Sequence, residues 1–202
     1  MRILSTALAI ALLALPGHAA ETILPGLADV TGVAANDVLN IRAAPNAKSA
    51  IIGSFAPDAA GIEVVATQDG WLRITTPEAS GWISARYATL RPGLWQPGAL
   101  PPGLACHGTE PFWGLTLDGN AARLTRPEAA QRHEGLRILQ PAGAGPSAHR
   151  ALVAEGLVAI VAPAPALCSD GMSDALFGLD VNVVLGEGAE ASYLHGCCSI
   201  GR

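Results

Sequence analysis

Positive charge is scarce in this chain. Its 202 residues contain 12 Lys and Arg against 17 Asp and Glu, which gives a net charge of −5 at pH 7, and Lys48 is the single lysine. Binding of nucleic acid or of an anionic membrane depends on clustered Lys and Arg side chains. The composition therefore argues against both as partners.

Sequence motifs of common active sites are also missing. The chain has no Gly-x-Ser-x-Gly, Ser-x-x-Lys or His-Glu-x-x-His motif and no glycine-rich phosphate loop. Two cysteine motifs are weaker alternatives. The stretch "LHGCC" around Cys197 contains the His-Gly-Cys of an L,D-transpeptidase, and "LCSDG" around Cys168 is faintly similar to papain-like endopeptidases, but each lacks its other catalytic residues. We expect no enzyme activity and no cofactor.

The start of the chain carries a long apolar run without the Pro residues that interrupt the later one over residues 157–168. Met1 and Arg2 precede an apolar stretch over residues 3–15, and small residues suited to cleavage follow up to Ala20. A run of this length with these flanks is typical of a secretory signal peptide and is short for a membrane-spanning helix. We predict a signal peptide over residues 1–20, an exported protein that is periplasmic or secreted, and no stable membrane insertion.

Cysteine is absent from the first half of the chain. Four cysteines follow, namely Cys106, Cys168, Cys197 and Cys198. An even number in an oxidising compartment predicts two disulfides. A bridge between the neighbours Cys197 and Cys198 would strain the peptide between them. We favour Cys168 with Cys197 and Cys106 with Cys198, although the count alone leaves the pairing open.

Histidines beside these cysteines raise the alternative of a metal site. Cys106-His107 and the His195-to-Cys198 segment would suit zinc or copper if they met, and Asp170 with Asp174 would offer oxygens to calcium. In an oxidising compartment the same cysteines are more often bridged. We therefore expect no metal.

Short strands separated by turn residues fill residues 21–91. Alternating or β-branched stretches recur at short, even spacing, and Asp-Gly, Pro-Asn and Pro-Asp turns separate them. This pattern predicts a small β-barrel. The strands expected are 27–33, 38–42, 49–55, 61–67, 71–75 and 81–84, followed by a short turn into a closing strand over 85–90.

The segment "DVLNIRAAPNAKSAIIGSF" shows this patterning best. Alternation places Leu39 and Ile41 on one face and Asn40 and Arg42 on the other. Ile51, Ile52 and Phe55 are expected to return the chain to the core, and Arg42 is expected to anchor the loop between these strands.

Residues of this first domain resemble the bacterial SH3-like domain family. The similar stretches are "GVAANDVLNIRAAPN", "IIGSF", "DGW" and "GWIS". The resemblance implies an exported protein whose domain contacts cell-wall peptide or an envelope protein. Trp71, Trp82 and Tyr87 are then candidates to line a peptide groove, with Tyr87 first and Trp71 next, or else to cover the barrel core.

The second half of the chain is set apart by "RPGLWQPGALPPG". Its Pro and Gly content predicts a short, semi-rigid linker over residues 92–103. Weak period-2 stretches then indicate a disulfide-bonded β-barrel-like domain over 104–202. Residues 126–135 are expected to form one or two helical turns.

Three phrases of the second domain resemble an uncharacterised bacterial envelope domain. They are "GTEPFWGLTL", "CSDGMSD" and "LHGC", and the resemblance implies a META-type or lipocalin-like barrel. Trp113 could form the floor of a ligand cavity with Glu110 at its mouth, or else an aromatic of this stretch could close the barrel.

These observations predict an all-β protein of two consecutive small barrels without catalytic activity. The function expected is that of an exported envelope protein that binds cell-wall peptide or a protein partner through its SH3-like domain. One alternative is a small-ligand carrier that uses the second barrel, and a less favoured one is a Cys-dependent wall transpeptidase.

Overall fold

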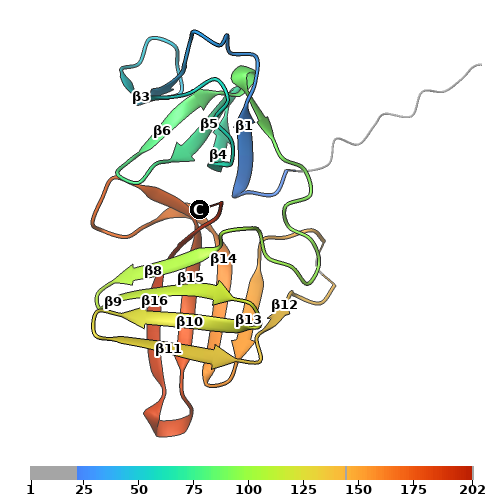
Figure 1. Cartoon of the computed structure of the whole chain (residues 1–202), viewed down its shortest axis with the longest axis vertical. Helices are drawn as coiled ribbons and strands as arrows, with labels where there is room; N and C mark the ends of the chain where they lie inside the picture. Colours follow the sequence, from blue (N-terminus) through green and yellow to red (C-terminus); the bar gives the residue numbers. More distant parts are fainter. Residues whose placement is uncertain (1–21, 144, 202) are drawn as a thin grey trace, which may run out of the picture.

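The computed structural model describes residues 22–143 and 145–201, so the predicted signal peptide over residues 1–20 lies outside the described part. Two antiparallel sheets follow each other along the longest axis of the molecule (Figure 1). The described residues contain strands and two short 3-10 turns and no α-helix. The prediction of two consecutive β domains is confirmed. Among these same residues, no helix is long and apolar enough to cross a membrane.

The first sheet has seven strands in the order β3-β2-β6-β5-β4-β1-β7. The expected strands and the turn into a closing strand are all present. Its elements are β1 (Gly26–Val30), β2 (Leu39–Arg42), β3 (Ile51–Phe55), β4 (Ile62–Gln68), β5 (Trp71–Thr75), β6 (Ser80–Ser84), the 3-10 turn η1 (Ala85–Tyr87) and β7 (Ala88–Leu90).

Alternation fixes which side chains of this sheet face the core. Leu39 and Ile41 are buried as expected, together with Leu72, Ile74 and Ile83 from β5 and β6. The prediction for β3 was wrong: Ile51 and Ile52 are 56% and 50% exposed, and of the three expected residues Phe55 alone packs against the core. The reason is that β3 is an edge strand whose pairing with β2 is irregular between Ile41 and Arg42.

The second sheet has nine strands in the order β11-β10-β9-β8-β16-β15-β14-β13-β12. In Figure 1 the strands β8 to β11 form one layer and cross the long strands β14 to β16 of the other. The strands are β8 (Ala105–Thr109), β9 (Phe112–Asp118), β10 (Ala121–Arg126), β11 (Ala129–Glu134), β12 (Arg137–Leu139), β13 (Arg150–Ala154), β14 (Leu157–Ser169), β15 (Leu176–Leu185) and β16 (Ser192–Ser199), with the 3-10 turn η2 (Gly188–Glu190) before β16.

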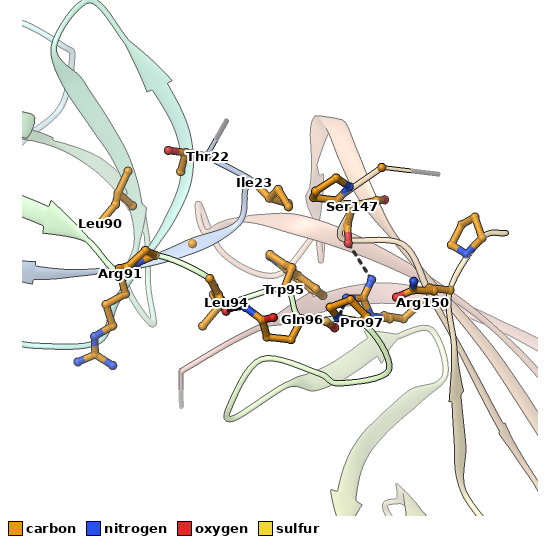
Figure 2. A pocket seen from close by; sticks show the side chains of 17 residues that line it. Thr22, Ile23, Leu90, Arg91, Leu94, Trp95, Gln96, Pro97, Ser147 and Arg150 are labelled. Carbon is orange, nitrogen blue, oxygen red and sulfur yellow. Dashed lines mark hydrogen bonds between the residues drawn. The ribbon is translucent and has the colours of Figure 1, made fainter. Parts of the chain in front are cut away.

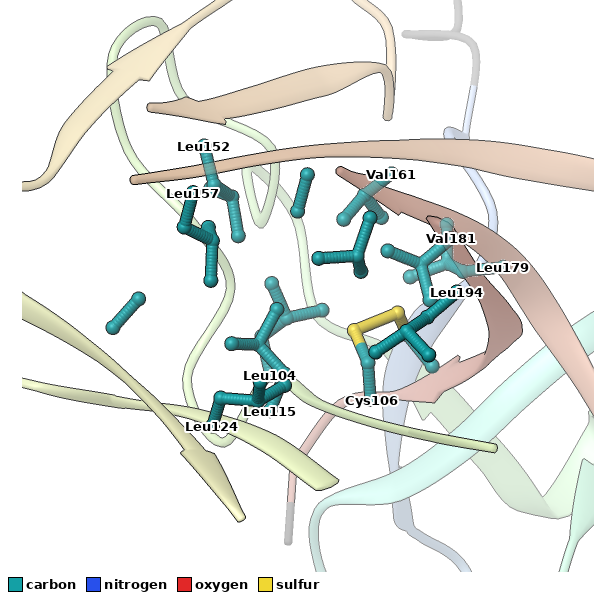
Figure 3. Packing of buried hydrophobic residues seen from close by; sticks show 14 of the residues in the cluster. Leu104, Cys106, Leu115, Leu124, Leu152, Leu157, Val161, Leu179, Val181 and Leu194 are labelled. Atoms are coloured by element: carbon teal, nitrogen blue, oxygen red, sulfur yellow. A yellow bond between two sulfur atoms is a disulfide. The ribbon is translucent and has the colours of Figure 1, made fainter. Parts of the chain in front are cut away.

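Apolar side chains from both layers fill the space between them. Figure 3 shows Leu115 and Leu124 of one layer facing Leu152, Leu157 and Val181 of the other. The Cys106–Cys198 disulfide lies within this core, and Cys168–Cys197 lies beside it. The favoured cysteine pairing is confirmed.

The helical turns expected over residues 126–135 are absent. Residues 129–134 instead form β11, which pairs with β10 from Ala121↔Glu134 to Arg126↔Ala129. The sequence did not suggest β11, because it is an exposed edge strand with few apolar residues. Pairing with a neighbouring strand therefore outweighs the local helix propensity of this stretch.

Residues 92–103 contain no strand or helix, and most of them are exposed, but Trp95 and Pro101 are buried. Trp95 is 5% exposed and belongs to the core of the second domain, as does Leu27 from β1 of the first. The Trp95 indole N–H donates to the Pro25 carbonyl at 2.8 Å. The end of the described chain lies at the same junction, where Ile200 N–H donates to Glu63 Oε1 at 3.2 Å.

Candidate functional site

The outer face of the β5–β6 hairpin carries Trp71 and Trp82, two of the aromatic residues that the sequence singled out. Strand pairing aligns Trp71 with Ser84, Arg73 with Trp82 and Thr75 with Ser80. Side chains of successive residues in a strand alternate between the two faces. These three rows therefore share one face, opposite the buried Leu72, Ile74 and Ile83. Neither tryptophan covers the core of the first domain.

The row formed by Thr75 and Ser80 attaches the first domain to the second. The Thr75 hydroxyl donates to the Leu176 carbonyl, and Leu176 N–H donates to the Ser80 hydroxyl at 2.8 Å. Ser80 N–H adds a hydrogen bond to the Asp174 carbonyl at 3.2 Å. Because these bonds anchor β15 over the Thr75–Ser80 row, the next row lies where the two domains diverge.

A groove of about 540 Å³ opens at the next row, which is formed by Arg73 and Trp82. Trp82 and Arg73 line one side together with Thr67 and Gln68 of β4. Residues 163–167 of the second domain line the other side. There β14 loses its regular pairing with β15 between Pro163 and Cys168, and Leu167 has a φ of 60°. We call this cavity the Trp82 groove.

Two arginines flank Trp82 in this row but differ in their contacts. The Arg73 guanidinium lies over the Trp82 ring, 5.5 Å from its centroid. Arg73 Nε is buried and has no hydrogen-bond partner within the described residues. Arg42, which pairs with Trp82 on β2, donates from Nη1 to the Ser49 carbonyl at 2.7 Å. Arg42 therefore anchors the loop that follows it, as the sequence predicted.

The other two aromatic candidates lie away from this groove. Trp71 is half-buried in the outermost row, beside Ser84. Tyr87 is 37% exposed at the end of η1, where its carbonyl accepts from Thr31 N–H at 3.0 Å and Arg86 lies over its ring. The structure thus brings Trp82 to a cavity between the domains and leaves Trp71 and Tyr87 on other parts of the first domain.

Glu110 and Trp113 line two adjoining hollows on the second domain. Glu110 is exposed and lines one of about 370 Å³, whereas Trp113 is 5% exposed and lines one of about 650 Å³. The indole lies directly over Gly108 and Gly196, because a Cβ at either position would come within 3 Å of its atoms. Trp113 thus both packs in the core and reaches the wall of a surface hollow.

The two hollows meet at His107 and Asp170. His107 Nε2 lies 3.5 Å from Asp170 Oδ2, and the imidazole meets the Phe177 ring edge-on at 4.8 Å. Burial alone would raise the pKa of Asp170. Hydrogen bonds from the backbone N–H groups of Met172 and Ser173, together with the nearby His107, lower this pKa by more than burial raises it. The pKa of Asp170 therefore lies below its ordinary value, which favours the carboxylate as an acceptor that fixes this loop.

All four cysteine sulfurs are used in disulfides, so none is present as the thiolate nucleophile that the transpeptidase hypothesis requires. Within residues 22–143 and 145–201, no three His, Cys, Asp or Glu side chains are grouped so that they could hold a metal ion.

A second cavity between the domains has a volume of about 530 Å³ and is lined by the linker. Figure 2 shows Trp95 and Gln96 of the linker beside Arg150 of β13. Arg150 is 3% exposed and donates to the carbonyls of Gln96, Ala99, Ser147 and His149 at 2.7–2.9 Å. Arg150 thereby holds the linker against the second domain.

Sequence reasoning missed Arg73, Arg150 and the wall formed by residues 163–167. The alternation in "WLRIT" and "GWIS" was a usable signal for Arg73, because it places Trp71, Arg73 and Trp82 opposite the apolar residues between them. Nothing in the local sequence shows that residues 163–167 lie opposite Trp82, since they come from the other domain.

Comparison with known proteins supports the assignment of the first domain. Residues 37–89 match the family model of the Bacterial SH3 domain. A search of curated proteins and a search of solved structures returned no match. The matched residues run from the turn before β2 into β7 and include Arg73 and Trp82. This part of the chain is therefore similar to bacterial SH3 domains.

Proposed function

We propose that this chain is a non-catalytic, exported binding protein of the cell envelope that binds an extended cell-wall peptide in the Trp82 groove. The observation that carries the proposal is the position of Trp82, an aromatic on the outer face of an SH3-like domain and at the mouth of a groove. Domains of the SH3 type bind extended peptides in aromatic-lined grooves.

The walls of the groove suit an extended chain. Trp82 offers a flat apolar surface, and Thr67 and Gln68 are exposed polar side chains on the same side. Pro163 and Pro165 on the opposite wall have no N–H, so this wall offers apolar rings and carbonyl oxygens to a ligand. The two disulfides are compatible with the oxidising compartment in which cell-wall peptide occurs.

The test is retention of the mature protein on purified cell-wall sacculi. Trp82→Leu removes the aromatic face but keeps an apolar residue, and we expect it to weaken retention by at least about tenfold, as for an aromatic hot spot. Val158→Ala is a matched control, because Val158 is an exposed apolar residue of β14 outside the groove. Equal retention of wild type and folded Trp82→Leu would contradict the proposal.

A further inference from the structure

Arg73 is the one charged residue among those lining the Trp82 groove. It lies in the middle of β5, in the row between Ala66 and Trp82. One face of its guanidinium is used by the Trp82 ring. Within the described residues the Arg73 side chain makes no hydrogen bond or ion pair, and its Nε is buried.

This arrangement leaves the buried Nε–H of Arg73 without an acceptor among the described residues. A guanidinium carries five N–H donors in a planar fork, and a buried donor without a partner is unfavourable. The Trp82 ring contacts the guanidinium through its face and accepts no hydrogen bond in its plane, so the N–H groups of Arg73 stay available to a ligand. The group that matches this edge is a carboxylate, which accepts two parallel hydrogen bonds from one guanidinium.

We infer that Arg73 binds a carboxylate of the peptide that occupies the Trp82 groove. The inference rests on the proposed function and names the chemical class of its ligand: an extended peptide with a C-terminal or side-chain carboxylate. Charge supports this class, because no acidic residue lines the groove to compete for Arg73. The uncharged wall opposite would leave the carboxylate without repulsion.

The probe is a soluble fragment pool from digested cell wall, used either native or with its carboxylates converted to methylamides. The proteins are the wild type, Arg73→Gln and, as matched control, Arg123→Gln, which changes an exposed arginine of β10. Because a bidentate charged pair is lost, we expect amidation to weaken binding to wild type by at least about tenfold. Arg73→Gln should bind both pools alike, whereas Arg123→Gln should behave as wild type.

The outcomes separate the two levels of the proposal. Equal binding of native and amidated fragments to wild type, or an unchanged preference in Arg73→Gln, overturns the carboxylate inference and leaves peptide binding in place. Absence of binding of either pool to wild type overturns both. Chemical denaturation of Arg73→Gln provides the folding control, and we expect a midpoint near that of wild type because the Arg73 side chain makes no hydrogen bond to lose.

Discussion

Two arginines occupy similar positions in this molecule and are used differently. Arg73 lies over Trp82 at 5.5 Å and Arg150 over Trp95 at 5.3 Å. Each lines a cavity between the domains, of about 540 and 530 Å³ respectively. Arg150 donates to four backbone carbonyls, whereas Arg73 Nε has no partner within the described residues.

The difference identifies which cavity is suited to a ligand. Burial lowers the pKa of Arg150, and its hydrogen bonds to carbonyls compensate for the loss of water around the cation. Those bonds are internal, so Arg150 has little left to offer a ligand. At Arg73 the stacking contact is present but the hydrogen bonds are missing. A count of donors and acceptors therefore separates a structural arginine from a binding arginine where the contact with an aromatic ring does not.

The largest effect is expected at Arg150. Arg150→Met would remove hydrogen bonds from a charged donor to four backbone carbonyls, each worth about 1.5–3 kcal/mol, so the free energy of unfolding should fall by at least about 3 kcal/mol. Urea denaturation measures this loss, and Arg123→Met is the control for removal of an exposed arginine. A midpoint equal to that of wild type would mean that Arg150 does not hold the linker.

The next effect is expected at the disulfide beside the Trp82 groove. Cys168 follows directly on residues 163–167 and is bridged to Cys197. Replacing both by alanine should lower the free energy of unfolding by roughly 2–4 kcal/mol. It should also weaken peptide binding, because that wall loses its anchor. Retention on sacculi at a temperature where the variant stays folded tests this point, and undiminished retention would show that the wall is not needed.

A smaller effect is expected in the row that joins the domains. Thr75→Val removes the donor to the Leu176 carbonyl and should lower the free energy of unfolding by about 1 kcal/mol. Hydrogen exchange of the Leu176 amide, which donates to Ser80, should become faster. Unchanged exchange at this amide would indicate that the two domains are held together by other contacts.

The smallest effect is expected at Tyr87, although the sequence had ranked it first. Tyr87→Ala changes an exposed residue away from the groove, so stability should stay within about 0.5 kcal/mol of wild type. Retention on sacculi should stay near that of wild type. A tenfold loss for Tyr87→Ala together with none for Trp82→Leu would place the binding surface at the η1 end of the domain instead.

Local patterning accounts for most of the first domain. Alternation and turn residues placed its strands correctly, because each strand buries one face in a single small core. The same reasoning failed for Ile51 and Ile52, since alternation does not reveal that β3 lies at the edge of the sheet. It failed again for residues 126–135, where a polar edge strand carries little periodicity.

The site was less predictable than the fold. The sequence identified Trp82 as a candidate because it is aromatic. Arg73 became a candidate only from the structure, which shows its contact with Trp82 and the missing hydrogen bond at its Nε. The groove itself depends on how β15 docks on Thr75 and Ser80, which is a property of the packing between domains. The cysteine pairing was favoured correctly because adjacent cysteines are poor partners, although that argument excludes only one of the three pairings.

The most direct test of this account observes both arginines at once. In a two-dimensional ¹⁵N–¹H spectrum of arginine Nε–H groups, spectra of Arg73→Gln and Arg150→Met assign the two signals. On addition of native cell-wall fragments, the Arg73 signal should shift and the Arg150 signal should stay in place, and the same concentration of amidated fragments should shift the Arg73 signal much less. An unmoved Arg73 signal at a fragment concentration that saturates binding, or an equal shift of both signals, would contradict the account.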